Sequence, residues 1–304
     1  VTSPLDISLN PDSSIYDIVS NGIVLNGRIT GGSLKGIIDA SSYYEDARAD
    51  LDILSVSIAK EINLQHRAGY GLDGTTGLDF FSLPPVYTNA SSNNTGGAAV
   101  AGGFVSDLSL LTLDDYEVRF SGPSAYTIVN SETNTVVSGG AYVSGSPITI
   151  DGLAFTITDN TGSPQAGDKF VISPTKGAAA SFSVALSDPN SFAASSTASG
   201  VPGDNSNAFT LAGLKDSQTI NGATFSEYYS SIVTDIGVAS GEASTNLKSQ
   251  QVFLDELNVA RESVSGVSVE EESINLIKLQ RAYEAAAKVM ETANKMLDAL
   301  LTIV

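Results

Sequence analysis

Apolar residues recur along this chain of 304 residues with two different periods. From about residue 33 to 66 they lie three or four residues apart, which lines one face of a helix. Between about residues 104 and 186 they alternate with polar residues, as in strands, and from residue 224 onward the helical spacing returns. This order predicts an α+β fold, a long-helix bundle with an inserted all-β domain. The helical spacing is clearest at Leu51, Leu54, Ile58 and Ile62.

Two runs within the predicted β domain show strict alternation. The second of them follows Asp151-Gly152, a dipeptide typical of the tight turn in a β-hairpin. Each run therefore presents one apolar face to a core. The faces consist of Tyr116, Val118 and Phe120 in the first run and of Leu153, Phe155 and Ile157 in the second.

Two stretches rich in Gly, Ser, Asn and Pro flank the strands, at residues 69–103 and 187–204, and we expect both to be linkers. An inserted domain needs two such chain crossings. We therefore expect residues 1–95 and 190–304 to form one discontinuous helical domain, with short strands near its start. Residues 96–189 are then the inserted all-β domain.

The last helix is predicted over residues 268–304. Thr224-x-x-Glu227 and Ser268-x-x-Glu271 are capping boxes that open the two carboxy-terminal helices, and Gly266 ends the first of them. Apolar residues of the last helix keep the 3-4 spacing of a coiled-coil seam, which a single helix cannot bury. The residues that we expect to form an assembly interface are Leu276, Leu279, Tyr283, Met290, Leu297 and Leu300.

The seam has two other interpretations. It could pack within its own fold as an ordinary bundle helix, although a helix of about 36 residues is roughly 50 Å long and exceeds a small core. It could also lie on a membrane surface, but such helices carry a basic polar face, and here acidic and basic residues are mixed. An isolated helix with this seam would aggregate, so we expect another long helix to cover it.

The amino-acid composition excludes many classes of function. The net charge of −19 would repel nucleic acid and anionic lipid. The chain has no cysteine and one histidine, which leaves no thiol nucleophile, disulfide, thiolate metal site or multi-histidine metal site. No long uncharged apolar run or signal peptide is present. The chain starts in what reads as the middle of a strand, so we expect an amino-terminal portion to be missing.

The residues that could take part in catalysis or metal binding have structural explanations. His66, near the end of the first helix, is expected to cap it or to face solvent. Asp114-Asp115 precedes a strand and is typical of a turn, and Glu270 to Glu272 suit the positive end of a helix dipole. The GLDGTTGLDFF segment lacks the spacing of a calcium loop, which favours a turn. We predict no catalytic, cofactor or metal site and no enzyme.

The carboxy-terminal sequence SGVSVEEESINLIKLQRAYEAAAKVMETANKMLDALLTIV resembles a signature shared by bacterial flagellar rod, hook and hook-associated proteins. Gln280, Tyr283 and Ala285 or Ala286 stand where that motif would put them. The segments GGSLKGIID, INLQHRAGYGLDGTTGLDFF and GDNSNAFTLAGL are similar to the same family, as is the β insert with YEVRF and the AGDKF segment. The resemblance covers most of the chain.

The resemblance implies a structural subunit of the flagellum that forms the junction between hook and filament by polymerising through long helices. It implies export through the flagellar type III system, an extracellular location, and a role in motility. The implied partners are other copies, the hook protein, a second hook-associated protein, and an export chaperone at the last helix. The implied cover for the seam is an amino-terminal helix, which nothing in this sequence matches.

A second hypothesis is a secreted β-domain, mounted on helices, with adhesin-like or carbohydrate binding or with hydrolytic activity. Carbohydrate platforms need exposed aromatic rings, whereas the aromatic fraction here is 7% and tryptophan is absent. The two hypotheses differ in the expected position of Tyr116, Tyr126 and Tyr142, which would share an exposed groove in a binding domain and disperse into the core otherwise.

Overall fold

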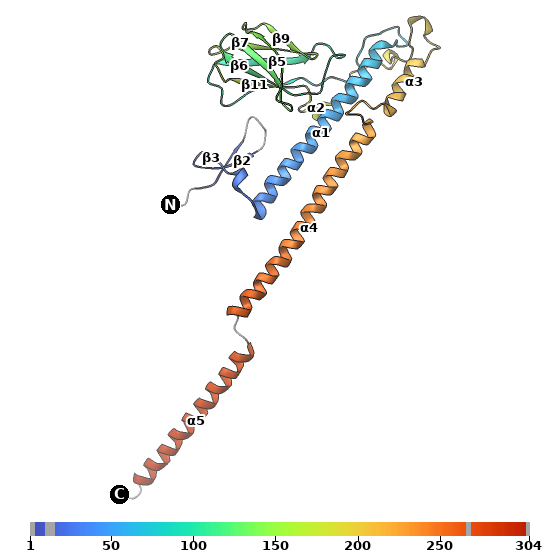
Figure 1. Cartoon of the computed structure of the whole chain (residues 1–304). Coiled ribbons are helices and arrows are strands. Elements are labelled where there is room, and N and C mark those ends of the chain that lie inside the picture. Colours follow the sequence, from blue (N-terminus) through green and yellow to red (C-terminus); the bar gives the residue numbers. More distant parts are fainter. Residues whose placement is uncertain (1–3, 10–15, 266–268, 302–304) are drawn as a thin grey trace. The chain divides into compact units, whose positions relative to one another are not determined.

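The protein is an α+β chain of long helices and an all-β domain (Figure 1). The computed structural model describes residues 4–9, 16–265 and 269–301. The chain divides into two compact units, Val1–Ala239 and Ser240–Val304. The predicted fold class is therefore confirmed.

The first long helix, α1, spans Gly32–Ala68, close to its predicted range. Its second half buries Leu54, Val56 and Ala59. The helix ends at Gly69, which has a φ of −99° and is not a left-handed cap. Glycine is needed there because a Cβ atom would lie 2.2 Å from the amide nitrogen Nδ2 of Asn207. The helix end is thus defined by close packing.

Three short strands precede α1, as the sequence predicts. β1 (Asp6–Leu9) pairs with β2 (Tyr16–Ser20), and β2 pairs with β3 (Ile23–Val24), both antiparallel. Asn21 and Gly22 both have positive φ, which suits the two-residue turn between β2 and β3. A 3-10 turn, Asn26–Arg28, leads into α1.

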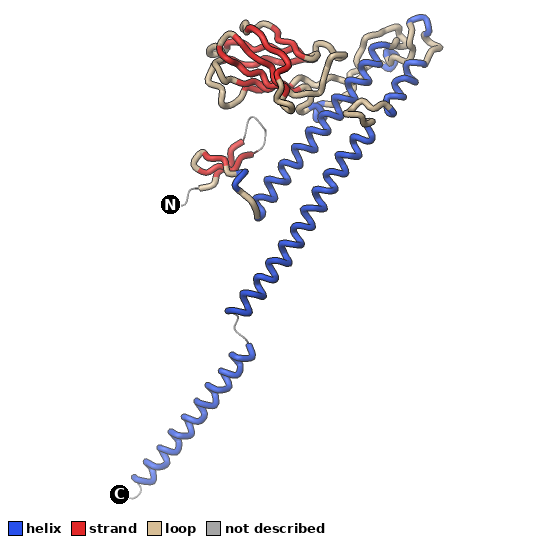
Figure 2. Tube along the Cα trace, viewed as in Figure 1, coloured by secondary structure: helices blue, strands red, loops and turns tan. Residues whose placement is uncertain are grey.

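The β domain has two antiparallel sheets, shown in red in Figure 2. Five strands follow the order β4-β11-β6-β7-β8, and three follow the order β5-β10-β9. The predicted faces of both alternating runs are buried and belong to one hydrophobic core. The strands are β4 (Tyr87–Ala90), β5 (Ala98–Val105), β6 (Tyr116–Gly122), β7 (Ala125–Asn130), β8 (Val136–Ala141), β9 (Pro147–Ile150), β10 (Leu153–Asp159) and β11 (Lys169–Ser173).

The predicted turn between β9 and β10 is present. Asp151 and Gly152 join the two strands directly, with φ values of 42° and 79°. The hydroxyl group of Tyr116 donates to the carboxylate of Asp151 at 2.6 Å, which ties the turn to the five-stranded sheet. A side chain at position 152 would also collide with the backbone oxygen of Asp107.

The segment expected to be the first linker holds two strands that belong to the sheets of the β domain, so that prediction is wrong. Residues 69–103 contain all of β4 and most of β5. The loop between these strands is held by the buried carboxylate of Asp168. It accepts hydrogen bonds from the backbone N–H groups of Thr95 at 2.8 Å and of Gly96 at 3.1 Å. The glycine and asparagine residues of this segment therefore lie in tight turns. Hydrogen bonds hold the backbone of these turns in one conformation, unlike that of a flexible linker.

The second expected linker is also folded against the body. Tyr70 and Ser195 exchange backbone hydrogen bonds of 2.8 and 3.1 Å, and the Ala193 side chain is buried. The short elements that follow β11 are α2 (Ala178–Ser181), the 3-10 turns Pro189–Ser191, Ala198–Gly200 and Leu214–Asp216, and the helix α3 (Ser206–Gly213).

Helix α4 spans Phe225–Ser265 and begins in the first unit. Its predicted capping box is confirmed, because Thr224 N donates to the Glu227 carboxylate at 2.9 Å and Glu227 N donates to the Thr224 hydroxyl at 3.2 Å. The Tyr228 hydroxyl donates to the Asp50 carboxylate of α1 at 3.0 Å. Ile232 of α4 is buried.

Helix α5 spans Val269–Leu301, close to the predicted range of 268–304. Glu270, Glu271 and Glu272 occupy its first turn, where the helix dipole favours acidic residues. Gly266 and Ser268, predicted to end one helix and to cap the next, lie outside the described residues.

Candidate assembly surface

Helix α5 presents its apolar seam to solvent. Five of the predicted interface residues have side chains that are 57% to 78% exposed. Leu300 lies within α5, but its side chain is outside the described part of the chain. A continuous apolar stripe of this kind would be buried in a finished assembly. The five exposed residues are Leu276, Leu279, Tyr283, Met290 and Leu297.

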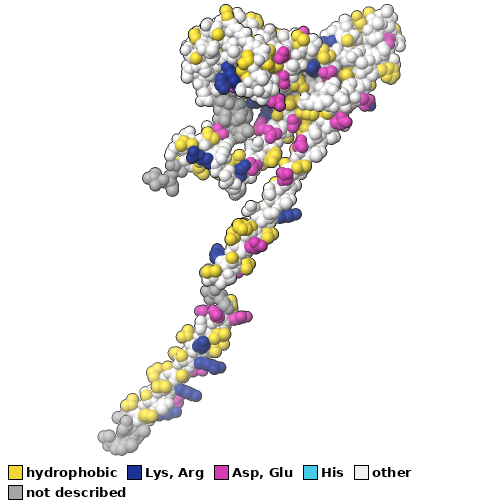
Figure 3. Space-filling view, viewed as in Figure 1, with side chains coloured by type: hydrophobic (Ala, Val, Ile, Leu, Met, Phe, Trp, Pro, Cys, Tyr) yellow, Lys and Arg dark blue, Asp and Glu magenta, His cyan; other side chains and the backbone are white. Residues whose placement is uncertain are grey.

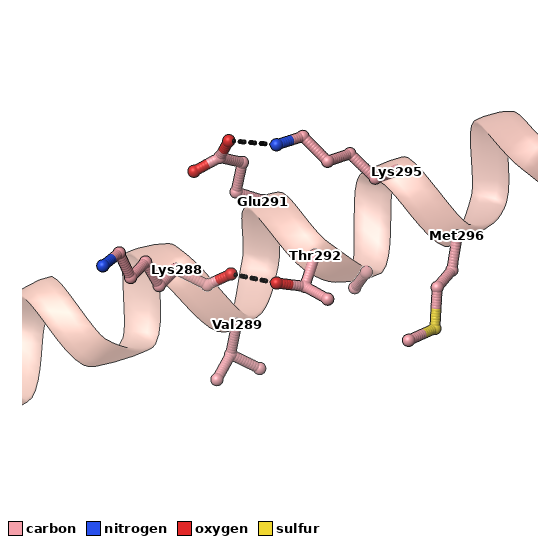
Figure 4. A pocket seen from close by; sticks show the side chains of 7 residues that line it. Lys288, Val289, Glu291, Thr292, Lys295 and Met296 are labelled. Carbon is pink, nitrogen blue, oxygen red and sulfur yellow. Dashed lines mark hydrogen bonds and ion pairs between the residues drawn. The ribbon is translucent and has the colours of Figure 1, made fainter.

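The opposite side of α5 is polar. Lys295 donates to the Glu291 carboxylate at 2.7 Å and forms an i,i+4 pair on the helix surface. Both side chains are well exposed, so the pair contributes little to stability. Figure 4 shows this pair on the side of the helix away from Met296 and Val289, and residues from both sides line one shallow hollow along α5. All residues of the hollow belong to α5, so it is a groove on one helix and no enclosed cavity.

Helix α4 has a similar exposed face in the second unit. Its residues Leu247, Leu254 and Leu257 are at least half exposed. Figure 3 shows apolar side chains in yellow along this helix and along α5. Both helices of the second unit therefore carry apolar surface that their own unit leaves open.

Helix α1 exposes a third stripe, of which the predicted helical spacing included only Leu51. Ile37, Tyr44 and Leu51 follow one another at intervals of seven residues, and all three are exposed. The signal was present in the sequence as a heptad repeat. The second half of the same helix, with Leu54 and Val56, is buried instead.

His66 is buried, so its predicted role as a cap or solvent-facing residue is wrong. Its Nδ1 lies 2.7 Å from the backbone oxygen of Leu78, and its Nε2 accepts the backbone N–H of Ala193 at 3.0 Å. The ring also contacts those of Phe80 and Phe192. His66 thus joins the end of α1 to the loops before and after the β domain.

Other side chains of α1 hold the same loops. Asn63 is fully buried and accepts the backbone N–H groups of Phe80 and Phe81 at 2.9 and 2.8 Å. The buried Asp52 carboxylate accepts the N–H groups of Gly177 and Ala179 at 2.8 and 2.7 Å, at the start of α2. Sequence reasoning missed these contacts, because their partners are more than fifteen residues away along the chain.

Asn207 of α3 completes this set of contacts. Its side chain accepts a hydrogen bond from Gln65 at 2.5 Å and donates one to the backbone oxygen of Ala193 at 2.6 Å. The residue is buried, which explains why a polar asparagine stands among the apolar residues of NSNAFTLAGL. The end of α1 therefore positions α3 and the β domain together.

Asp73, in the segment considered as a calcium loop, occupies a structural position. The Asp73 carboxylate accepts hydrogen bonds from Thr75 N at 2.9 Å and from the Ser191 hydroxyl at 2.5 Å, which closes a turn. The hydroxyl bond from Ser191, followed by those from Thr75, lowers the pKa of Asp73. Within the described residues, no group of three His, Cys, Asp or Glu side chains is placed to hold a metal ion. No helix among them is long and apolar enough to span a membrane.

The three tyrosines that distinguish the two functional hypotheses do not share an exposed groove. Tyr116 and Tyr142 are buried, and Tyr126 is a partly buried residue packed against the same core. Burial and its hydrogen bond to Asp151 raise the pKa of the Tyr116 hydroxyl well above its ordinary range. These rings stabilise the β domain and offer no aromatic platform to a sugar.

Three protein-family models match separate parts of the chain. Residues 3–81 match the flagellar hook-associated protein FlgK helical domain, and residues 89–174 match the flagellar hook-associated protein 1, D2-like domain. Residues 261–303 match the flagellar basal body rod FlgEFG protein C-terminal region. The last match contains the whole of α5.

Curated relatives match most of the chain. It is 32% identical over 275 residues to flagellar hook-associated protein 1 of Escherichia coli (strain K12), covering 90% of this chain and 49% of that protein. It is 32% identical over 282 residues to the protein of the same name from Salmonella typhimurium, covering 90% of this chain and 50% of that protein. The chain thus spans about half the length of these relatives.

A solved structure shares the fold. The flagellar hook junction protein FlgK from Burkholderia pseudomallei aligns with a TM-score of 0.67 at 22% identity, covering 87% of this chain and 71% of that one. At this identity the match concerns the fold alone. The matched 87% of this chain includes long helices and the β-rich domain.

Proposed function

Because the chain belongs to the family of flagellar hook-associated protein 1, we propose that it is part of a structural subunit that forms the junction between hook and filament. The subunit polymerises through its long helices and has no catalytic role. The observation that carries this proposal is the exposed apolar seam of α5, which lies in the segment that matches flagellar rod proteins. A seam of this length needs a long helical partner.

The proposed partners are other axial proteins of the flagellum. Copies of the same subunit lie beside one another, with the hook protein on one side and a second hook-associated protein on the other. The seam of α5 pairs with a long helix from the amino-terminal part of the full-length protein. The exposed stripes of α4 and α1 give further helices a place to pack. No nucleic acid or membrane is involved, in agreement with the net charge of −19.

We also propose that the subunit is secreted by the flagellar type III system and resides outside the cell. Before export, a dedicated chaperone covers the seam of α5 at Leu276, Leu279, Tyr283, Met290, Leu297 and Leu300. The physical reason is that an exposed apolar stripe promotes aggregation while the subunit waits in the cytoplasm. The chain has no cysteine, so no disulfide hinders passage through a narrow channel.

Charge placed in the seam tests this function. In the full-length protein, Met290→Asp with Leu297→Asp should weaken helix pairing by several kcal/mol, on the order expected for burying unpaired charge. Junction assembly and chaperone binding should both be lost. The matched control is Ala285→Asp with Thr292→Asp, which has the same charge and the same seven-residue spacing on another face of α5.

Motility and secreted filament subunits provide the readout in cells that lack the native junction protein. The seam variant should swim poorly and release filament subunits into the medium, whereas the control should swim normally. If the seam variant still binds chaperone and restores junctions, α5 is only an internal packing helix.

A further inference from the structure

Three asparagine residues of the chain, Asn21, Asn26 and Asn221, are followed directly by glycine. In such a pair the backbone attacks the asparagine side chain most easily, because glycine has no side chain to shield its amide nitrogen. The attack converts asparagine to aspartate or isoaspartate without an enzyme. Its rate in a folded protein depends on how firmly the asparagine is held, and the structure holds Asn26 and Asn221 very differently.

The side chain of Asn26 is fixed at both of its polar atoms. Its Oδ1 accepts the backbone N–H of Ile18 at 2.8 Å. Its Nδ2 donates to the Asp17 carboxylate at 3.0 Å and to the backbone oxygen of Tyr16 at 3.4 Å. Rotation of this side chain toward the nitrogen of Gly27 would break these bonds, which slows the reaction at this pair.

Asn221 lies in an exposed turn and is held far less. Ile220 and Ala223 exchange backbone hydrogen bonds of 3.2 and 2.8 Å, and between them Asn221 and Gly222 have φ values of 50° and 79°. Both central residues are exposed. Among the described residues, none makes a hydrogen bond to the Asn221 side chain or to the Gly222 nitrogen. A left-handed φ is unfavourable for residues with a side chain, so mainly the two bonds of the turn oppose rotation of Asn221.

We propose that Asn221 is a site of spontaneous deamidation in the folded protein, with water as the only co-reactant. The nitrogen of Gly222 loses its proton and bonds to Cγ of Asn221. The bond from Cγ to Nδ2 then breaks, and the departing amide group takes up a proton and leaves as ammonia. Water opens the resulting cyclic imide at either carbonyl carbon, which gives aspartate or isoaspartate. No atom is oxidised or reduced, and the reaction requires no assembly of the subunit.

Isoaspartate at position 221 would disturb the start of α4. It adds a methylene group to the backbone between Ile220 and Ala223, so the two hydrogen bonds of this tight turn can no longer both form. Ile220 is buried, and Thr224, the next residue after the turn, belongs to the capping box of α4. Aspartate keeps the length of the backbone and adds a negative charge near the positive end of the helix dipole, where it is favourable.

Peptide mapping of aged protein tests the site. Purified full-length protein is incubated at mildly alkaline pH, digested and analysed by mass spectrometry, and isoaspartate is labelled with isoaspartyl methyltransferase. The peptide with Asn221 should be deamidated roughly tenfold or more faster than the peptide with Asn26, whose hydrogen bonds must break first. In urea both pairs should react at similar rates, because each follows an aliphatic residue. If Asn221 reacts no faster than Asn26 in the folded protein, the inference is overturned.

Amide hydrogen exchange at Ala223 measures the effect on α4. Exchange should become faster as isoaspartate accumulates in the native chain. The matched control is Asn221→Gly, because glycine adopts a positive φ without strain and has no amide group to lose. Exchange in this variant should not change with age. If exchange at Ala223 stays the same in native chains that contain isoaspartate, the inferred disturbance of α4 is wrong.

Discussion

At the scale of single residues, the most consistent feature is the use of buried or shielded polar side chains to hold loops. The Asp204 carboxylate accepts hydrogen bonds from the backbone N–H groups of Ser196 at 2.8 Å and of Ser206 at 3.0 Å. The hydroxyl groups of both serines donate to it as well, at 2.9 and 2.7 Å. The bond from the Ser206 hydroxyl is the main reason that the pKa of Asp204 lies well below its ordinary value of 3.8.

This shift predicts a pH-dependent loss of stability in Asp204→Asn. A carboxyl group whose pKa is lowered in the folded state stabilises the fold above the pKa of the unfolded chain, and the contribution disappears as the pH falls toward the folded value. The variant should therefore be less stable than the native chain at about pH 7, with a gap that narrows below about pH 4. Urea unfolding at a series of pH values measures the gap.

Asp216→Asn serves as the control for that experiment. Asp216 is paired only with the adjacent, exposed Lys215, so its replacement should change stability little at any pH. A gap for Asp204→Asn that stayed constant down to about pH 3 would show that its carboxylate is not specially stabilised.

At this scale the sequence was least informative. The hydrogen bonds of His66, Asn63 and Asn207 could not be predicted from the sequence. Each of these residues bonds to a partner that only the tertiary fold brings near. The prediction that the chain has no catalytic site was an inference from composition. Local signals did succeed where both partners are close in sequence, as in the capping box at Thr224 and the turn at Asp151.

At the scale of elements, helices were predicted well and connections poorly. Hydrophobic periodicity over many turns is a robust signal, and α1 and α5 begin and end within a few residues of their expected bounds. Glycine and serine in residues 69–103 indicated a linker, whereas they serve close packing. Gly96, for example, lies where a Cβ atom would be 2.4 Å from the Asp168 carboxylate.

Helix α4 contains two glycines that, unlike Gly96, have free space where a side chain would lie. At Gly237 and Gly241 a Cβ atom would meet nothing within 4 Å. Glycine in a helix interior costs about 1 kcal/mol relative to alanine. Gly237→Ala with Gly241→Ala should therefore stabilise α4 by roughly 2 kcal/mol and slow amide hydrogen exchange around these positions.

Gly96→Ala provides the contrast, because its side chain would collide with Asp168 and should destabilise the β domain. If the α4 substitutions left hydrogen exchange unchanged, the helix would already be as rigid as alanine could make it. Assembly of the α4 variant would also reveal whether a partner helix approaches closely at these glycines.

At the scale of the whole molecule, the β domain has a nearly self-contained core. Most core residues come from its own strands, with a contribution from Val56 of α1. We predict that a fragment of residues 85–176 folds alone and unfolds in one cooperative transition. A fragment of residues 96–189, the boundaries expected from sequence, lacks β4 and leaves the edge of β11 unpaired. It should unfold at a lower temperature or aggregate.

Circular dichroism on heating compares the two fragments. Equal melting temperatures would show that β4 contributes nothing to the domain, and the sequence-derived boundary would then be the better one. Failure of both fragments to fold would place the domain's stability in its contacts with α1, including the Asp52 bonds to the start of α2.

The pairing of β4 with β11 has a consequence for evolution. These are the first and last strands of the β domain, and Tyr87 stands directly opposite Ser173 in the antiparallel register. The chain thus leaves the helical body and returns to it at neighbouring points. Insertions, deletions or exchange of everything between those two residues need not move α1 or α3. The helices can therefore keep their sequence and packing while the β domain changes independently.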